Sequence, residues 1–318
     1  YVDGTQGWKA TDTSSLTDIE LQPSYITATG GTPTTCGDYK IHTFTGPGTF
    51  TVSTIGNPIG GPSNVDYLVV AGGGGGGNGQ YAGGGGGAGG YRESSGVASG
   101  SYTASPLGAC VSALPVSVQG YTITVGGGAP TITAPTRPGG DGSNSTFSTI
   151  ISTGGGGGGG GANAPGVGAA GGSGGGSATY GCTAGGAGNT PPVSPPQGNA
   201  GGNVGDFAGT ATKGGGGGGA TSAGTGSTTP PTSAAGPGGN GATSSITASP
   251  VTRAGGGGGS TDLGGPQGTG GPGGGGNGDN GSSATAGTVN TGGGGGGGKG
   301  NGGGGGSGIV IIRYKFQN

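Results

Sequence analysis

Runs of consecutive glycine constrain this chain more than any other feature of its sequence. The longest covers residues 154–161, and seven others contain four glycines or more. These seven span residues 72–77, 83–87, 214–219, 255–259, 273–276, 292–298 and 302–306. Glycine has no side chain to pack and loses more backbone freedom on folding than any other residue, so such runs favour neither helix nor ordinary strand. The runs are therefore either disordered or packed on one another.

Composition keeps the disordered alternative open. The chain has 101 glycines and 21 prolines among 318 residues, which is typical of low-complexity sequence. In that interpretation the runs are flexible linkers between adhesive patches.

The ordered alternative is a bundle of left-handed helices of the polyproline-II type, which have three residues per turn and no internal hydrogen bonds. Each helix can bond to neighbours on all sides, and glycine is required because a Cβ would hold the backbones apart, as in collagen. Eight residues at about 3.1 Å each make a rod of roughly 25 Å. We expect this bundle. Its structural positions include Gly72, Gly154, Gly157, Gly214, Gly255, Gly292 and Gly302.

Short β-type segments flank the glycine region. Alternation predicts a hairpin of residues 39–44 and 49–53 around Gly46-Pro47-Gly48. Residues 65–71 (VDYLVVA) and 309–316 (IVIIRYKF) are continuous apolar runs, typical of buried strands, and are expected to pair in one sheet. Further strands are predicted at 116–118, 121–125 and 147–151.

The predicted fold class is all-β or irregular, with a small β-sheet base that carries a bundle of polyglycine-II helices joined by variable loops. Residues 1–35 are expected to form a connector, 36–71 the hairpin and first strand of the base, 72–308 the bundle, and 309–318 the closing strand. Polar segments within the bundle, such as 187–204 and 220–236, are expected to be loops between the glycine runs.

Composition also excludes several classes of function. The net charge is -2 and 6% of residues are charged, so no nucleic-acid footprint is present. Neither a membrane span nor an intact signal peptide is predicted. Cys36, Cys110 and Cys182 show no metal-ligand spacing and are interpreted as free, buried thiols, although one pair could bridge.

Catalytic motifs occur only as isolated matches. Residues 171–175 satisfy G-x-S-x-G, but the single histidine, His42, lies far away in sequence and no strand-to-helix elbow is predicted. Residues 293–299 imitate a P-loop, yet Gly300 stands where Ser or Thr is needed. Residues 139–144 approach a calcium-binding repeat that occurs once. We expect no enzyme, no cofactor and no metal site.

The segment 65–71 followed by glycines, together with 306–314 (GSGIVIIRY), resembles the glycine-rich domain that closes tail fibres of marine phages, particularly cyanophages. The alternation of glycine runs with polar segments is similar to the polyglycine-II tip adhesins of T-even-like phages. That resemblance implies distal loops that bind a bacterial receptor, either an outer-membrane protein or a surface glycan. The N-terminal segment does not resemble the attachment domain of those adhesins.

The resemblance therefore implies a receptor-binding adhesin at a virion's tail-fibre tip, assembled in the host cytoplasm and acting outside it. A homotrimer with contacts in residues 1–60 is expected, without nucleic acid and without membrane insertion. The alternative is a structural or ice-binding glycine-rich protein, but the unequal run lengths favour recognition. Aromatic residues flanked by glycine are the expected receptor contacts, because rigid rings give contact area at little entropic cost. They are Tyr81, Tyr91, Tyr102, Tyr180 and Phe207. The alternative for each ring is that it packs against the bundle.

Overall fold

A computed structural model describes residues 2–3, 7–8, 22–79, 81–100, 102–133, 137–160, 166–178, 184–204, 213–226, 234–262, 265–281 and 283–318. The strands are β1 (Val2–Asp3), β2 (Gly7–Trp8), β3 (Thr27–Thr29), β4 (Thr32–Cys36), β5 (Tyr39–Phe44), β6 (Gly48–Thr54), β7 (Asn64–Val70), β8 (Tyr91–Glu93), β9 (Leu114–Pro115), β10 (Gly120–Thr124), β11 (Ser145–Phe147), β12 (Ile150–Ser152), β13 (Ala242–Ser244), β14 (Val251–Arg253) and β15 (Ile309–Lys315). One short 3₁₀ helix, η1, spans Pro106–Gly108. No helix in the described part of the chain is long and apolar enough to cross a membrane.

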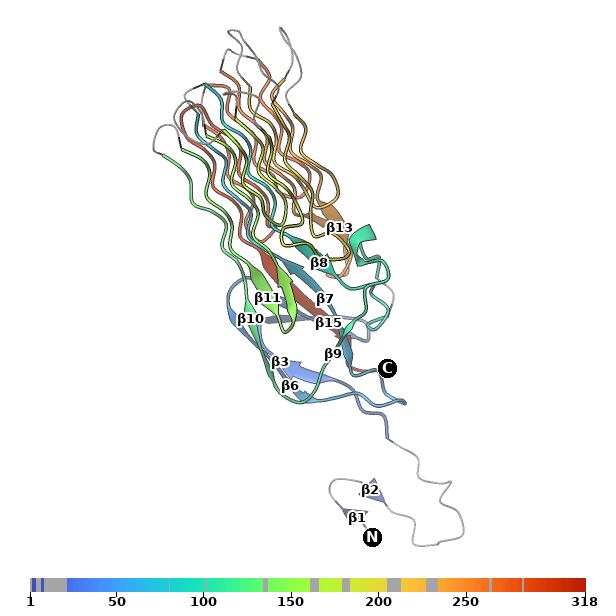
Figure 1. The fold of residues 1–318 in the computed structure, drawn as a ribbon. Helices are drawn as coiled ribbons and strands as arrows, with labels where there is room; N and C mark the ends of the chain where they lie inside the picture. The colour runs from blue at the N-terminus through green and yellow to red at the C-terminus, as the bar shows by residue number, and fades with distance from the viewer. Residues whose placement is uncertain are drawn as a thin grey trace.

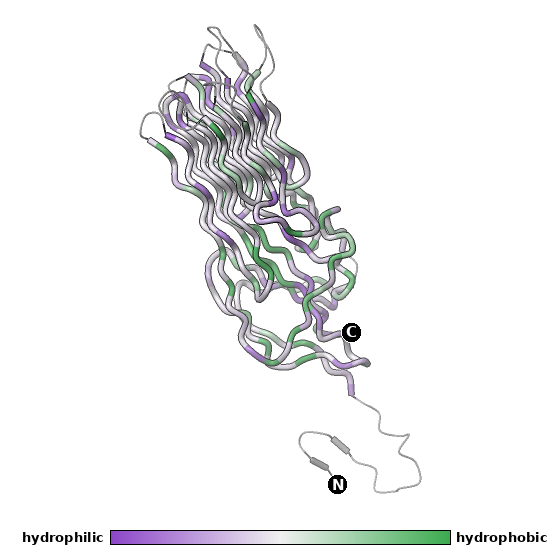
Figure 2. Tube along the Cα trace, in the orientation of Figure 1, coloured by the Kyte–Doolittle hydropathy of each residue, from purple (hydrophilic) through white to green (hydrophobic). Residues whose placement is uncertain are grey.

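Two antiparallel sheets pack face to face and form the base of the molecule (Figure 1). One has the order β12-β11-β10-β6-β3, and the other has the order β4-β5-β15-β7-β8 with β9 attached to β7. Aromatic rings fill the space between them, with Phe50 in contact with Phe147 and Tyr314. Hydrophobic residues concentrate in this sandwich, whereas the bundle is pale (Figure 2).

The central strands β7 and β15 confirm the pairing expected from their apolar runs. They are antiparallel, with Ile311 opposite Leu68. Val69 and Val310 face the aromatic core, whereas Leu68 and Ile311 belong to a second apolar cluster on the other side of the sheet. Burial on both faces explains why neither strand shows polar alternation.

The predicted hairpin of residues 39–44 and 49–53 is wrong. β5 pairs with β4 and β15, whereas β6 pairs with β3 and β10 in the opposite sheet. Alternation correctly indicated that Phe44 and Phe50 are buried, and both enter the same inter-sheet core. A pattern of period two defines which face of a strand is buried but not its partner, so the turn at Gly46 joins two sheets instead of two neighbours.

Three other boundaries also differ from the prediction. Residues 147–151 form no single strand, because Ser148 has a φ of 54° in the turn between β11 and β12. The strand expected at 116–118 is absent, because these residues lie between β9 and β10. The expected connector, 1–35, includes β3 and most of β4, so it contributes to both sheets.

Free cysteines are present, but they are not buried as expected. Cys36 is half-buried and Cys110 is exposed. Cys182 lies outside the described residues.

Above the sandwich, extended segments that we call struts form the predicted polyglycine-II bundle. In residues 72–78, successive N–H groups donate to three different neighbours in turn, residues 137–143, 303–306 and 84–87, at 2.8–3.0 Å. Every third N–H returns to the same neighbour, which is the period of a three-fold helix. The carbonyl oxygens of the same strut accept from three more segments, residues 155–158, Ala129 and residues 295–298. A strut inside the bundle thus replaces side-chain packing by backbone bonds in every direction.

Outer struts differ in sequence from inner ones. Where one side of a strut faces solvent, one position in three can carry a side chain, as with exposed Pro266, Thr269 and Pro272. The polar segments expected to be loops, 187–204 and 220–236, therefore include outer struts: Gly201 donates to Gly186, and Gly224 donates to Ala200. The expectation that these segments are only loops is wrong.

The chain passes up and down the bundle. Residues 72–78 continue from β7 away from the sandwich, and residues 302–308 return into β15 (Figure 1). The C-terminus and the segment 22–26, which bonds to Asn57, lie at the base. Turns at the opposite end, here called the distal end, are therefore the farthest points from the sandwich.

Candidate functional site

Three turns meet at the distal end of the described chain: residues 78–79 with 81–82, residues 279–281 and residues 299–301. Gly79 donates to the carbonyl of Gly298 at 3.1 Å, and the Asn78 side-chain amide donates to Gly300. Gly83, where the first turn ends, donates to Ser260 Oγ at 2.7 Å. The two ends of the first turn, at Gly79 and Gly83, are therefore held by the segment 298–300 and by the strut end 260–262.

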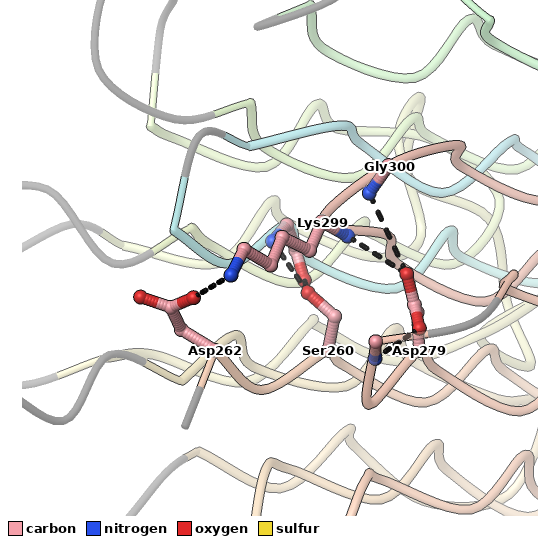
Figure 3. A network of polar contacts seen from close by, with 7 residues as sticks. Ser260, Asp262, Asp279, Lys299 and Gly300 are labelled. Carbon is pink, nitrogen blue, oxygen red and sulfur yellow. Dashed lines mark hydrogen bonds and ion pairs between the residues drawn. The ribbon is translucent and has the colours of Figure 1, made fainter. Parts of the chain in front are cut away.

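Asp279 organises two of these turns (Figure 3). Its side chain is buried, and Oδ1 accepts from the Gly281 N–H at 2.6 Å. Oδ2 lies 3.3 Å from the Lys299 N–H and 3.5 Å from the Gly300 N–H. A carboxylate that accepts several backbone N–H groups stabilises their positions, so Asp279 fixes the backbone from which the Lys299 side chain projects.

The Lys299 ammonium forms an ion pair with Asp262 Oδ1. The lysine side chain is 43% exposed, whereas that of Asp262 is 12% exposed. The second carboxylate oxygen of Asp262 points away from Lys299 (Figure 3). One acceptor and the remaining ammonium donors can therefore meet a ligand side by side.

Tyr81 lies within the first turn and is 38% exposed. Gly79 and Gly83, two residues before and after Tyr81, are held by the two segments that carry Lys299 and Asp262. At the distal end, the segments that carry Tyr81, Asp262 and Lys299 are thus bonded to one another.

The family of the chain is shown by a sequence comparison. A family model described as a glycine-rich domain matches residues 43–315. The chain belongs to this glycine-rich domain family. No curated protein and no solved structure matches it. In this glycine-rich domain, the matched range includes β6 to β15 and the whole bundle, but it begins after β3 and β4.

Tyr91 and Tyr102 do not lie at loop tips, so this part of the sequence prediction is wrong. Tyr91 belongs to β8, is 1% exposed and donates its hydroxyl to Glu93 Oε2 at 2.9 Å. Burial raises the pKa of its phenol. Tyr102 covers the buried Arg313 guanidinium, 5.2 Å from its ring centre. Both rings fill space next to the base, which is the packing alternative. Tyr180 and Phe207 lie outside the described residues.

All seven glycines predicted as structural occupy tight positions. A Cβ added to any of them would lie 1.9–2.5 Å from a backbone carbonyl oxygen. Real Cβ contacts are essentially never shorter than 3.0 Å, so each position requires glycine. Gly292 has a second reason, because its φ of 68° disfavours other residues.

Sequence reasoning missed Asp262, Asp279 and Lys299. A signal was available, because residues 154–308 contain only six charged side chains and these are three of them. In a segment with so few charges, each charged residue is a candidate for a structural or binding role. Their convergence at one end could not be derived without the path of the chain.

Proposed function

We propose that this glycine-rich domain is a receptor-binding adhesin of a phage tail-fibre tip, which recognises a molecule of the bacterial surface through its distal turns. The observation that carries the proposal is the separation of roles along the molecule. Inner struts present backbone to backbone and offer no side chains, whereas Tyr81 and the Asp262–Lys299 pair lie at the end opposite the sandwich.

The energetic logic supports this assignment. Binding is weakened by every loop that must be ordered, so a rigid support increases affinity without new contacts. A bundle whose struts bond to one another on all sides supplies such a support. The apolar end strands and the glycine runs also resemble the corresponding parts of phage fibre domains.

A structural or ice-binding role is the second candidate. It is favoured by the three-residue spacing of outward residues on outer struts such as 266–272. The outward residues vary, however, among Pro, Thr, Ala and Asn from strut to strut, so they offer no uniform lattice. Variation suits recognition better.

The test is adsorption of the fluorescently labelled full chain to a panel of bacterial strains. An adhesin gives saturable adsorption that excess unlabelled protein competes away. Absence of competed adsorption on every strain, combined with inhibition of ice recrystallisation, would support the second candidate instead.

We also infer that the assembled protein is a homotrimer with contacts in residues 1–60, as the resemblance to phage fibres implies. Analytical ultracentrifugation of the full chain is expected to give three times the monomer mass of 28.4 kDa. A monomer that still adsorbs to cells would contradict the trimer and leave the adhesin intact.

A further inference from the structure

We propose that Tyr81, Asp262 and Lys299 bind a neutral sugar ring of a bacterial surface glycan. This inference rests on the proposed function and specifies the chemistry of its ligand. It starts from the position of the three side chains, which project from segments that are bonded to one another at the distal end.

The ion pair selects for hydroxyl groups. Because Asp262 and Lys299 neutralise each other, the pair exerts little net attraction on an anionic or a cationic ligand. A hydroxyl both donates and accepts, so two adjacent hydroxyls of a sugar can donate to the outward Asp262 oxygen and accept from the ammonium. Hydrogen bonds to charged partners are about twice as strong as neutral ones.

Tyr81 supplies the apolar part of the site. A pyranose has one face of C–H groups, and an exposed phenol ring offers that face a flat apolar surface with a polar tip. Small-ligand sites combine such apolar surface with a few placed polar groups.

The support of the site is already ordered. Asp279 accepts one backbone N–H from its own turn and two from the turn that carries Lys299, and Ser260 bonds to the end of the turn that carries Tyr81. Binding therefore does not have to pay for ordering these backbones.

A protein receptor fits the described surface less well. A stable protein interface buries about 800 Å² on each partner and is centred on large apolar or aromatic side chains. Among the described residues, the large hydrophobic side chains exposed near the distal end are Tyr81 and Val167, which are too few to form the centre of such an interface.

The experiment compares adsorption of the full chain to treated cells of a strain that it binds. Periodate cleaves vicinal diols of glycans, whereas proteinase K removes exposed surface proteins. We expect periodate to abolish adsorption and proteinase K to leave it intact. Polysaccharide extracted from the same cells is expected to compete as a soluble probe.

Variants locate the binding to the three residues. Tyr81→Ser and Asp262→Asn are each expected to weaken adsorption about tenfold. The matched control is Val289→Ser, because Val289 is 66% exposed in a turn at the base side of the bundle. Circular dichroism melting checks that each variant is folded.

Two outcomes overturn the inference. Adsorption that survives periodate and is lost after proteinase K identifies a protein receptor, which leaves the adhesin proposal standing. Adsorption that is periodate-sensitive but equal in all variants places glycan binding elsewhere on the molecule. Failure of the wild-type chain to adsorb to any strain defeats the proposed function itself and is therefore distinguishable from both.

Discussion

At the scale of single residues, a glycine of the bundle can be replaced by alanine only where the added Cβ would point away from neighbouring struts. Neighbouring glycines of one outer strut show both cases. A Cβ on Gly127 would meet nothing within 4 Å, whereas a Cβ on Gly128 would lie 2.0 Å from the Gly305 carbonyl oxygen. Both glycines lie in the same extended strut, so the change in backbone propensity on replacement by alanine is nearly the same. The difference in stability between the two variants therefore measures packing.

Gly128→Ala is therefore expected to lower the free energy of unfolding by a few kcal/mol or to prevent folding, as replacement of glycine does in collagen. Gly127→Ala is expected to change it by less than about 1 kcal/mol, because the added methyl meets no neighbour and alanine restricts the unfolded chain. Urea denaturation measures both. Equal effects would mean that the struts are not close-packed.

Gly157 and Gly226 extend the same argument. A Cβ at Gly157 would lie 1.9 Å from the Gly139 carbonyl oxygen, and a Cβ at Gly226 would lie 2.2 Å from that of Asn203. Gly226 lies in the polar segment 220–236, where sequence alone suggests a tolerant loop. The structure places it on an outer strut, so we expect alanine to be harmful at both positions.

His42, in β5, forms one hydrogen bond to the connection between β3 and β4 and one to β15 of its own sheet. Its Nδ1 donates to the Gly30 carbonyl at 2.6 Å, and its Nε2 lies 3.0 Å from the Tyr314 hydroxyl. Burial lowers the pKa of the imidazole, the bond to Gly30 raises it, and the Lys40 charge lowers it further. The net direction is downward, so the folded state favours the neutral ring.

Stability is therefore expected to fall as the pH drops below the unfolded pKa of about 6.5, because the unfolded chain binds the proton first. The loss continues until the pH reaches the lowered pKa of the folded state. Urea midpoints between about pH 8 and pH 5 measure it. His42→Gln is the control, since its amide does not titrate, and its midpoints should depend less on pH. A wild type with the same dependence as this variant would contradict the assignment.

At the scale of elements, a strut is as completely hydrogen-bonded as a strand. The segment 84–90 donates to residues 153–159, 215–218 and 292–295 in turn, and β7 is bonded on both sides within its sheet. Both kinds of element therefore need a concerted opening before their amides exchange.

Amide hydrogen exchange is expected to show protection in residues 72–77 and 84–90 comparable to that in β7. Exposed Gly127 should exchange faster. The measurement is deuterium uptake by mass spectrometry of overlapping peptides. Rapid exchange throughout the struts would show that the backbone bonds open independently of the sandwich.

The elements also explain how far sequence reasoning could reach. β7 and β15 were predictable because burial on both faces leaves a continuous apolar run in the sequence. The long glycine runs were predictable as struts because no other residue allows backbones to pack so closely. The partners of β5 and β6 could not be predicted, because an alternating pattern does not encode which sheet a strand joins. The distal site was not either, because the residues that form it are separated by up to 218 positions (Tyr81 to Lys299) and meet only through the order of the struts.

At the scale of the whole molecule, sandwich and bundle are continuous. β7 runs into the strut 72–78, and the strut 302–308 runs into β15. The second apolar cluster contains Leu68 and Ile311 from the sheet together with Ala88, Ala220 and Ala254 from struts. The sandwich and the bundle thus share one apolar layer. If the two separated, apolar side chains of both would be exposed to water.

We therefore expect the chain from the sandwich to the distal turns to unfold in one cooperative transition. Ile311→Ala, at a side chain with no exposed surface, should lower the free energy of unfolding by about 2–5 kcal/mol. It should also accelerate exchange in the struts 72–77 and 84–90, far beyond the sheet that loses the methyl groups. Differential scanning calorimetry and hydrogen exchange measure the two effects.

Ile151→Ala is the matched control, because Ile151 is 49% exposed at the sheet edge and its truncation removes little buried area. Two separate calorimetric transitions, or strut amides that keep wild-type protection in Ile311→Ala, would mean that the bundle is stable without its base.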